Sequence, residues 1–159
     1  MSEYAQCLGI LDELFRKDCL FSLATAKDNI PSIRVVDTYY EHEAFWIVTY
    51  ATSKKVIEIE RNPHVALCQN FYAFQGKASN VGHPLKEHNA DIREKLIAAF
   101  QPWYFAHNNE DDEHMCYVKF VPETGFFYQN GTGYKANFLK KVVETFPFES
   151  PIDFDQEKI

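Results

Sequence analysis

The spacing of apolar residues along the chain predicts two kinds of element. Residues 2–17 place Tyr4, Leu8 and Leu11 at steps of three and four, which indicates an amphipathic helix that Ser2 can cap. A second helix is expected at 89–101 and a short one between Ser53 and Pro63. Runs rich in β-branched and aromatic residues predict strands at 19–26, 32–40, 45–50, 64–70, 71–79, 115–121 and 125–130.

The order of these elements predicts a mainly β fold with peripheral α-helices. Only about four residues separate 32–40 from 45–50, so these strands are expected to form an antiparallel hairpin. Several short strands without regular β-α-β alternation favour a small Greek-key antiparallel barrel in a single domain, residues 1–159. We expect residues 102–114 to be irregular. The segment after Gly131 should be a loop and a short helix, with a loosely packed tail after about residue 147.

Composition narrows the class of protein. Hydrophobic residues make up 46% of the chain, which supports a packed core, and the net charge of -7 disfavours binding to nucleic acid or to an anionic membrane. The four cysteines are scattered, which is typical of a reducing compartment. The first residues lack the pattern of a signal peptide, and no apolar run is long enough for a membrane span. We therefore expect a cytoplasmic protein.

The start of the short helix carries an unusual charge pattern. In T-Y-A-T-S-K-K-V-I-E-I-E, Lys54 and Lys55 occupy the first turn, where the helix dipole favours acidic residues. An anion at the helix mouth would reverse this unfavourable placement, because the first amide N–H groups also point there. The alternative is that both lysines are solvated and that Lys54 forms a weak pair with Glu58.

An arginine in the neighbouring strand strengthens the hypothesis of an anion site. Arg34 lies within S-I-R-V-V-D, an otherwise apolar strand, and its planar side chain suits bidentate phosphate binding. The predicted hairpin brings this strand next to the one that leads into Ser53. The alternative is an arginine that points to solvent or pairs with Asp37 or a glutamate.

Three segments together resemble a known family. L-F-S-L-A-T-A-K-D-N-I-P-S-I-R-V-V-D, F-W-I-V-T-Y-A-T-S-K-K-V-I-E-I-E-R-N-P-H-V-A-L and F-Q-G-K-A are similar in order and spacing to the FMN-binding split barrels typified by pyridoxamine 5'-phosphate oxidase. The resemblance extends from the first helix to about residue 130. Length and the P-W-Y-F stretch are more similar to the general-stress and nitroimidazole-resistance branches.

The resemblance implies a set of cofactor-binding residues and a partner. It implies a homodimer with FMN at the subunit interface and Trp103 near the partner's flavin, although Trp103 is equally well interpreted as a core or dimer-interface residue. Backbone groups of Val35 and Val36 would meet the ring edge. The side chains implied to hold the phosphate and ribityl chain are Arg34, Thr49, Ser53, Lys54 and Lys55.

The chain also departs from the oxidase pattern. It lacks the C-terminal arginine–histidine pair that grips substrate in the oxidases, and Phe71 stands near the position of a family glutamine. The histidines have no familiar metal spacing, so we expect no metal site and assign no catalytic side chain. G-T-G-Y-K-A matches a dinucleotide fingerprint, but too little chain follows for a β-α-β unit, so a mobile turn is expected.

Three functions remain after this reading. The favoured one is an FMN-dependent oxidoreductase that takes electrons from NAD(P)H or from a small-molecule substrate. A non-catalytic flavin binder, such as a redox sensor or stress protein, is the alternative. A barrel that binds single-stranded nucleic acid is disfavoured by the net charge of -7. Haem or a deazaflavin in place of FMN stays open.

Overall fold

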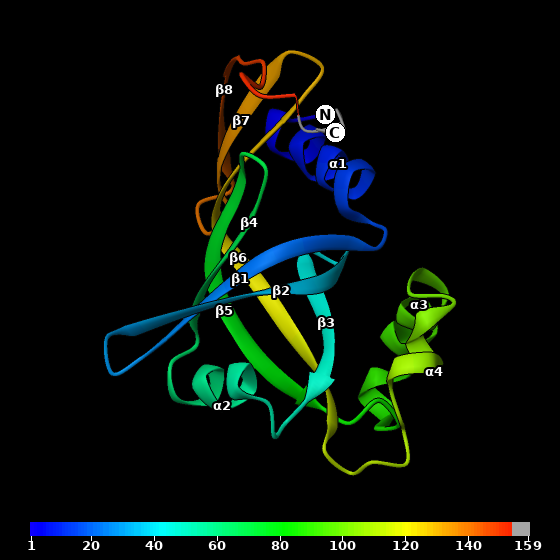
Figure 1. Cartoon of the computed structure of the whole chain (residues 1–159). Coiled ribbons are helices and arrows are strands. Elements are labelled where there is room, and N and C mark those ends of the chain that lie inside the picture. Colours follow the sequence, from blue (N-terminus) through cyan, green and yellow to red (C-terminus); the bar gives the residue numbers. More distant parts are fainter. Residues whose placement is uncertain (154–159) are drawn as a thin grey trace.

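A computed structural model describes residues 1–153 and shows a closed antiparallel barrel (Figure 1). The hydrogen-bonded order β3-β2-β1-β4-β5-β6 closes because β3 also pairs with β6. Strand β4 lies beside β1, which gives the Greek-key order and confirms the predicted fold class. The barrel strands are β1 (Cys19–Lys27), β2 (Ile30–Glu41), β3 (Ala44–Tyr50), β4 (His64–Gln69), β5 (Tyr72–Gly82) and β6 (Met115–Gln129).

Strand β6 is one continuous strand of 15 residues, so our prediction of two separate strands was wrong. The sequence suggested a break because Pro122 lies in the middle. The structure accommodates this proline with a bulge, since Gln75 pairs with Thr124 and Gly76 pairs with Pro122, leaving Glu123 unmatched in the register. The first half of β6 therefore pairs with β3 and the second half with β7.

The C-terminal segment forms a hairpin rather than the predicted loop and short helix. Strands β7 (Thr132–Asn137) and β8 (Val142–Pro147) extend the sheet outward from β6. Asn130 and Gly131 both have positive φ and close the tight turn between β6 and β7. G-T-G-Y-K-A thus lies mostly in β7, so the expected mobile turn was also wrong, and residues 154–159 of the predicted tail lie outside the described part.

Four α-helices of the described segment 1–153 lie around the barrel. Helix α1 (Glu3–Phe15) starts as predicted, with the Ala5 amide donating to Ser2 Oγ at 3.1 Å, and buries Cys7, Leu11 and Phe15 against the core. Helix α2 (Lys54–Arg61) follows β3, and α3 (Ala90–Ala99) follows a short 3₁₀ turn at Glu87–Asn89. Helix α4 (Trp103–His107) was not predicted.

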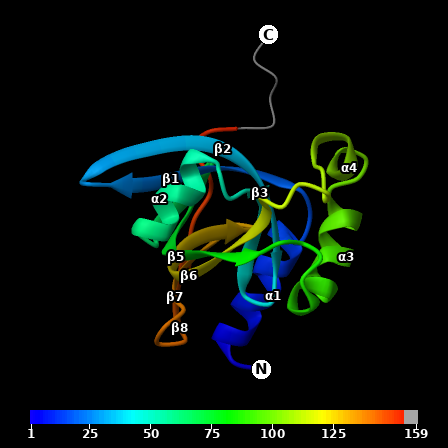
Figure 2. The same ribbon diagram turned by 90° about the horizontal axis from the view of Figure 1, so that it is seen from below.

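The helices occupy separate sides of the barrel. Figure 2 shows α2 beneath the β1–β2 hairpin, with α3 and α4 on the opposite side. None of the helices in residues 1–153 combines the length and apolar character that crossing a bilayer requires.

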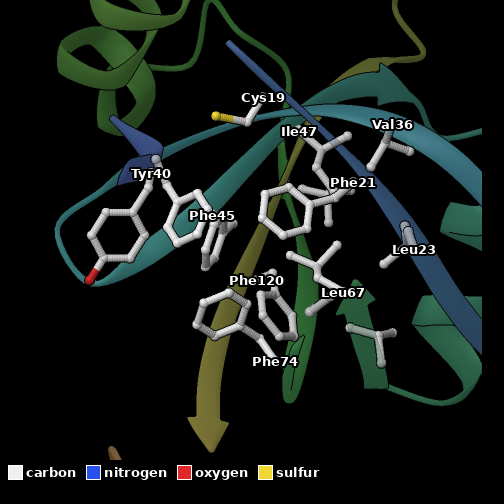
Figure 3. Packing of buried hydrophobic residues seen from close by; sticks show 14 of the residues in the cluster. Cys19, Phe21, Leu23, Val36, Tyr40, Phe45, Ile47, Leu67, Phe74 and Phe120 are labelled. Atoms are coloured by element: carbon white, nitrogen blue, oxygen red, sulfur yellow. The ribbon is translucent and has the colours of Figure 1, made fainter. Parts of the chain in front are cut away.

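Aromatic rings fill the barrel core (Figure 3). The Phe45 ring has its centroid between 5.0 and 6.0 Å from those of five neighbouring rings, two of them arranged edge to face and three tilted. These rings come from α1 and from four strands, so one cluster fixes the strands relative to each other. The neighbours are Phe15, Phe21, Tyr40, Phe74 and Phe120.

Candidate functional site

The mouth of helix α2 lies directly after strand β3. The chain turns within three residues, since the Ser53 amide donates to the Tyr50 carbonyl at 3.0 Å and Ser53 becomes the N-cap of α2. The Ser53 hydroxyl makes no capping hydrogen bond and lies instead 3.4 Å from Thr49 Oγ1. Amide N–H groups of the first turn are therefore not capped by that side chain, which leaves them available to an anion.

Two cationic side chains from different elements meet at this helix mouth. Lys55 is half-buried in α2, and its pKa is lowered first by burial and then by the positive charge of Arg34 on β2. Burial is the larger of these two causes, and the smaller one places the Arg34 charge within electrostatic reach of Lys55. A bound anion would offset both charges.

The Arg34 guanidinium is held in place from one side. Its Nη1 donates to the Leu23 carbonyl at 3.2 Å and to Thr25 Oγ1 at 2.7 Å, while Nη2 lies 3.6 Å from Glu58 Oε2. The side chain remains 22% exposed, so it keeps access to solvent. Arg34 is thus consistent with both interpretations of the sequence. Its charge acts on Lys55 at the helix mouth, and its side chain also pairs with a glutamate, Glu58.

Lys54 has a different environment from Lys55. Its side chain is 74% exposed and its Nζ lies 3.8 Å from Glu58 Oε1, which is the i,i+4 pair considered as the alternative. Exposed pairs of this kind contribute little to stability. Lys54 is therefore less firmly part of the helix mouth than Lys55.

The outer edge of β2 is open next to this cluster. Strand β2 pairs with β3 only over Tyr39–Glu41, so within residues 1–153 the edge facing away from β1 has no strand partner from residue 30 to residue 38. The Val35 side chain is 64% exposed, whereas Val36 is buried in the core. Alternate backbone amides and carbonyls of this segment are available to a planar hydrogen-bonding ligand.

Within a single chain, Trp103 lies apart from the other residues predicted to bind the cofactor. It begins α4, on the opposite side of the barrel from α2 (Figure 2). Its indole ring stacks on Phe100 with centroids 4.6 Å apart, and Nε1 donates to Asp18 Oδ2 at 2.9 Å. The single chain therefore shows a half-buried packing residue at this position.

A sequence comparison places this site in a family. The family model described as pyridoxamine 5'-phosphate oxidase matches residues 11–128, which contain all but the last residue of the barrel strands and include the α2 mouth. The chain belongs to the pyridoxamine 5'-phosphate oxidase family. Comparison with curated proteins gave no match.

Several solved structures share this fold and carry different titles. A NimC/NimA family protein from Clostridium acetobutylicum is 20% identical, with 93% of this chain and 95% of that chain covered at a TM-score of 0.56. A pyridoxamine 5'-phosphate oxidase-related, FMN-binding protein from Nostoc punctiforme is 12% identical, with 94% and 98% covered and a TM-score of 0.56. A protein titled F420 reductase is 15% identical, with 72% and 94% covered and a TM-score of 0.52. At these identities the likeness establishes the fold.

The family match ends before the C-terminal hairpin. Strands β7 and β8 begin after residue 128 and lie at the far end of the barrel from α2 (Figure 1). The turn that joins them comes closer to the β1–β2 hairpin, since Leu139 lines a cavity together with Thr25 and Pro31. Phe71, which was compared with a glutamine position of the family, has its ring centroid 6.4 Å from that of Phe148.

A carboxyl pair beside Trp103 was missed by sequence reasoning. Asp37 on β2 shares a hydrogen bond with Asp18, and burial together with this neighbour raises the pKa of Asp37 to about 7. No motif marks this pair, because Asp18 and Asp37 meet only through the pairing of β1 with β2. Below about pH 7 this carboxyl pair therefore keeps a proton. Asp37 lies two residues after Val35 in β2.

The cysteine nearest the α2 mouth is unreactive. Cys116 pairs with Thr49 in the β3–β6 register, and burial raises the pKa of its thiol to about 11. It therefore remains a thiol at neutral pH. Within residues 1–153, no cluster of three side chains suited to metal binding is present.

Proposed function

We propose that this family member binds FMN with its phosphate at the mouth of α2. The observation that carries the proposal is a helix N-terminus that Ser53 does not cap, with Lys55 in its first turn and Arg34 only 3.6 Å from Glu58 of the same helix. Two cations and free amide N–H groups suit a doubly charged phosphate. We call this group of Arg34, Thr49, Ser53, Lys55 and the first amides of α2 the phosphate cradle.

The residues of the cradle fit the parts of the cofactor. The Thr49 and Ser53 hydroxyls, 3.4 Å apart, can donate to phosphate or ribityl oxygens, and the open β2 edge at Val35 and Val36 can meet the ring. When bound, the flavin supplies hydride and electron transfer. The protein holds the cofactor and shields it from solvent, and we assign no catalytic side chain.

We also propose that the flavin lies at a homodimer interface. Ile33 and Val35 are 71% and 64% exposed on the outer face of β2, which is apolar surface that a partner subunit would bury. A partner would also bring a second Trp103 toward the first subunit's ring. Electrons would come from NAD(P)H or from a small-molecule substrate.

A non-catalytic flavin binder is the second candidate function. It is favoured by the position of the C-terminal hairpin, which leaves the β2 edge without a substrate-gripping pair from that segment. Bleaching of the flavin band by NADH or NADPH would support the oxidoreductase. A holoprotein that neither donor reduces would support the binder. A bound deazaflavin also stays open, because a protein of the same fold is titled F420 reductase.

Substitution of the cradle cations tests the placement of the phosphate. Arg34→Ala and Lys55→Ala should each weaken FMN binding by about 1.5–3 kcal/mol, the usual contribution of hydrogen bonds to a charged group. Quenching of flavin fluorescence measures the dissociation constant. Arg61→Ala is the matched control, because Arg61 is an exposed cation at the opposite end of the same helix.

Two outcomes would overturn the proposal. If both cradle variants bind FMN as the Arg61→Ala control does, the phosphate lies elsewhere. If the wild-type protein is colourless after incubation with excess FMN and removal of the unbound FMN, the protein is not an FMN-binding flavoprotein.

A further inference from the structure

We propose that Glu58 is a built-in counter-anion of the phosphate cradle, which stabilises the cradle when it is empty and opposes the phosphate when FMN binds. Glu58 is thereby the residue that sets how strongly the protein prefers FMN to riboflavin. The inference rests on the proposed function and concerns the specificity of the same site.

Glu58 occupies an unusual position for an acidic residue. It lies on the inner side of α2, is only 4% exposed, and reaches back toward the hairpin of β1 and β2. Thr25 donates a short hydrogen bond to Oε2, and Ser32 donates to Oε1 at 3.4 Å. Buried carboxylates are rare unless they are paired, and this one is paired with two hydroxyl groups and with Arg34 of the cradle.

The carboxylate also contacts two cations of the same region. Its oxygens lie 3.6 Å from Arg34 Nη2 and 3.8 Å from Lys54 Nζ. The pKa of Glu58 is lowered, first by the hydrogen bond from Thr25 and also by the charges of Lys54 and Arg34. Glu58 is therefore ionised at neutral pH, and its negative charge lies between two positive ones.

This negative charge has opposite effects on the empty and the occupied cradle. In the empty cradle it offsets the positive charge of Arg34, which it contacts at 3.6 Å and which, after burial, lowers the pKa of Lys55. A phosphate that approaches the same cations is repelled by Glu58. Riboflavin lacks the phosphate, so its binding should not depend on Glu58.

Arg34 does not need Glu58 to hold its position. Its Nη1 atom keeps the Leu23 carbonyl and Thr25 Oγ1 as acceptors, at 3.2 and 2.7 Å, when the charge of Glu58 is removed. Removal of the charge alone should therefore leave the cradle assembled and more attractive to phosphate. Glu58→Gln makes this change with almost the same shape.

The experiment compares Glu58→Gln with Glu60→Gln, each titrated with FMN and with riboflavin. Glu60 is exposed on the same helix and loses the same charge, so it controls for the change in net charge. We expect Glu58→Gln to bind FMN about five- to tenfold more tightly than Glu60→Gln, with riboflavin affinities equal within about twofold. FMN affinity in Glu58→Gln should also fall more steeply with salt.

Thermal unfolding gives a second measurement. Without flavin, Glu58→Gln should unfold at a lower temperature than the wild type, because the cradle cations lose their counter-anion. Saturating FMN should raise its midpoint by more than it raises that of the wild type. If Glu58→Gln fails to fold, Glu58→Asp replaces it, and drawing back the carboxylate should tighten FMN binding about two- to threefold over the wild type.

The outcomes separate this inference from the proposed function. A wild-type protein that binds neither FMN nor riboflavin contradicts the proposed function. A wild-type protein that binds FMN, with Glu58→Gln equal to or weaker than Glu60→Gln, contradicts the role of Glu58 alone. Equal tightening of FMN and riboflavin would also contradict it, because the effect would not depend on the phosphate.

Discussion

At the scale of single residues, Asp37 and Asp18 form the pair with the clearest dependence on pH. The folded protein keeps a proton on Asp37 up to about pH 7, whereas the ordinary pKa of such a carboxyl is 3.8. Between these two pH values the folded state binds more protons than the unfolded chain. Stability should therefore fall as the pH rises through this range and level off above about pH 7.

Asp37→Asn should remove this loss of stability. The amide cannot ionise and can still donate to Asp18, so the variant should unfold at a higher temperature than the wild type at pH 8. The difference should become small at about pH 3, below the ordinary pKa of 3.8, where the wild-type carboxyl is mostly protonated in both states. Calorimetry at the two pH values measures it, with Asp111→Asn, an exposed loop residue, as control. A constant difference across this range would show that Asp37 does not hold the proton.

The sequence identified some site residues and missed others for a physical reason. Lys55 could be found because a cation in the first turn opposes the helix dipole, and Arg34 because it interrupts an apolar strand. Glu58 and Asp37 carry no such local conflict. Their properties arise from side chains that are 26 and 19 residues distant in the chain, namely Ser32 and Asp18.

At the scale of elements, local pattern predicted the barrel strands but not the C-terminal hairpin. Asn130-Gly131 is a strong signal for a two-residue hairpin turn, and both residues have positive φ in the structure. We interpreted it as a loop because the following segment, rich in lysine, suited a helix. The pairing of β7 with β6 outweighed that propensity.

The bulge between β5 and β6 gives an element-scale prediction. A Cβ atom on Gly76 would lie 2.1 Å from the Val121 carbonyl oxygen and 2.8 Å from the Pro122 Cα, both backbone atoms that cannot move aside. Gly76→Ala should therefore lower the free energy of unfolding by about 1–3 kcal/mol. Urea denaturation measures this change.

Gly9→Ala is the matched control for this substitution. Nothing lies within 4 Å of a Cβ on Gly9, and alanine in the interior of α1 should stabilise the protein by about 0.5–1 kcal/mol. Opposite signs for the two glycines are expected. A neutral Gly76→Ala would mean that β5 and β6 approach less closely than described.

At the scale of the whole molecule, the sequence pattern predicted a barrel but not which two strands would close it. The β3–β6 pairing joins Phe45 to Phe120 across a long separation in sequence. It depends on the aromatic core that fits between the strands, rather than on any turn signal. The hairpins were predictable from neighbouring segments, whereas this contact required the assembled fold.

The proposed dimer can be tested on the exposed face of β2. Val35→Lys places a charge on apolar surface that a partner would bury, so it should raise the dimer dissociation constant at least about tenfold. Analytical ultracentrifugation measures the change, and FMN binding should weaken with it. Val142→Lys is the control, because Val142 is 54% exposed on β8, outside the family match. Equal effects of the two variants would place the interface elsewhere.

The open edge of β2 has a further consequence. Unpaired amides and carbonyls along an exposed strand can recruit a strand from any neighbouring polypeptide, and apolar side chains such as Ile33 make such recruitment more favourable. A bound ring and a second subunit would cover this edge. Newly synthesised copies should then precipitate most readily when riboflavin is scarce, so that vitamin supply would govern how much of this polypeptide accumulates in usable form.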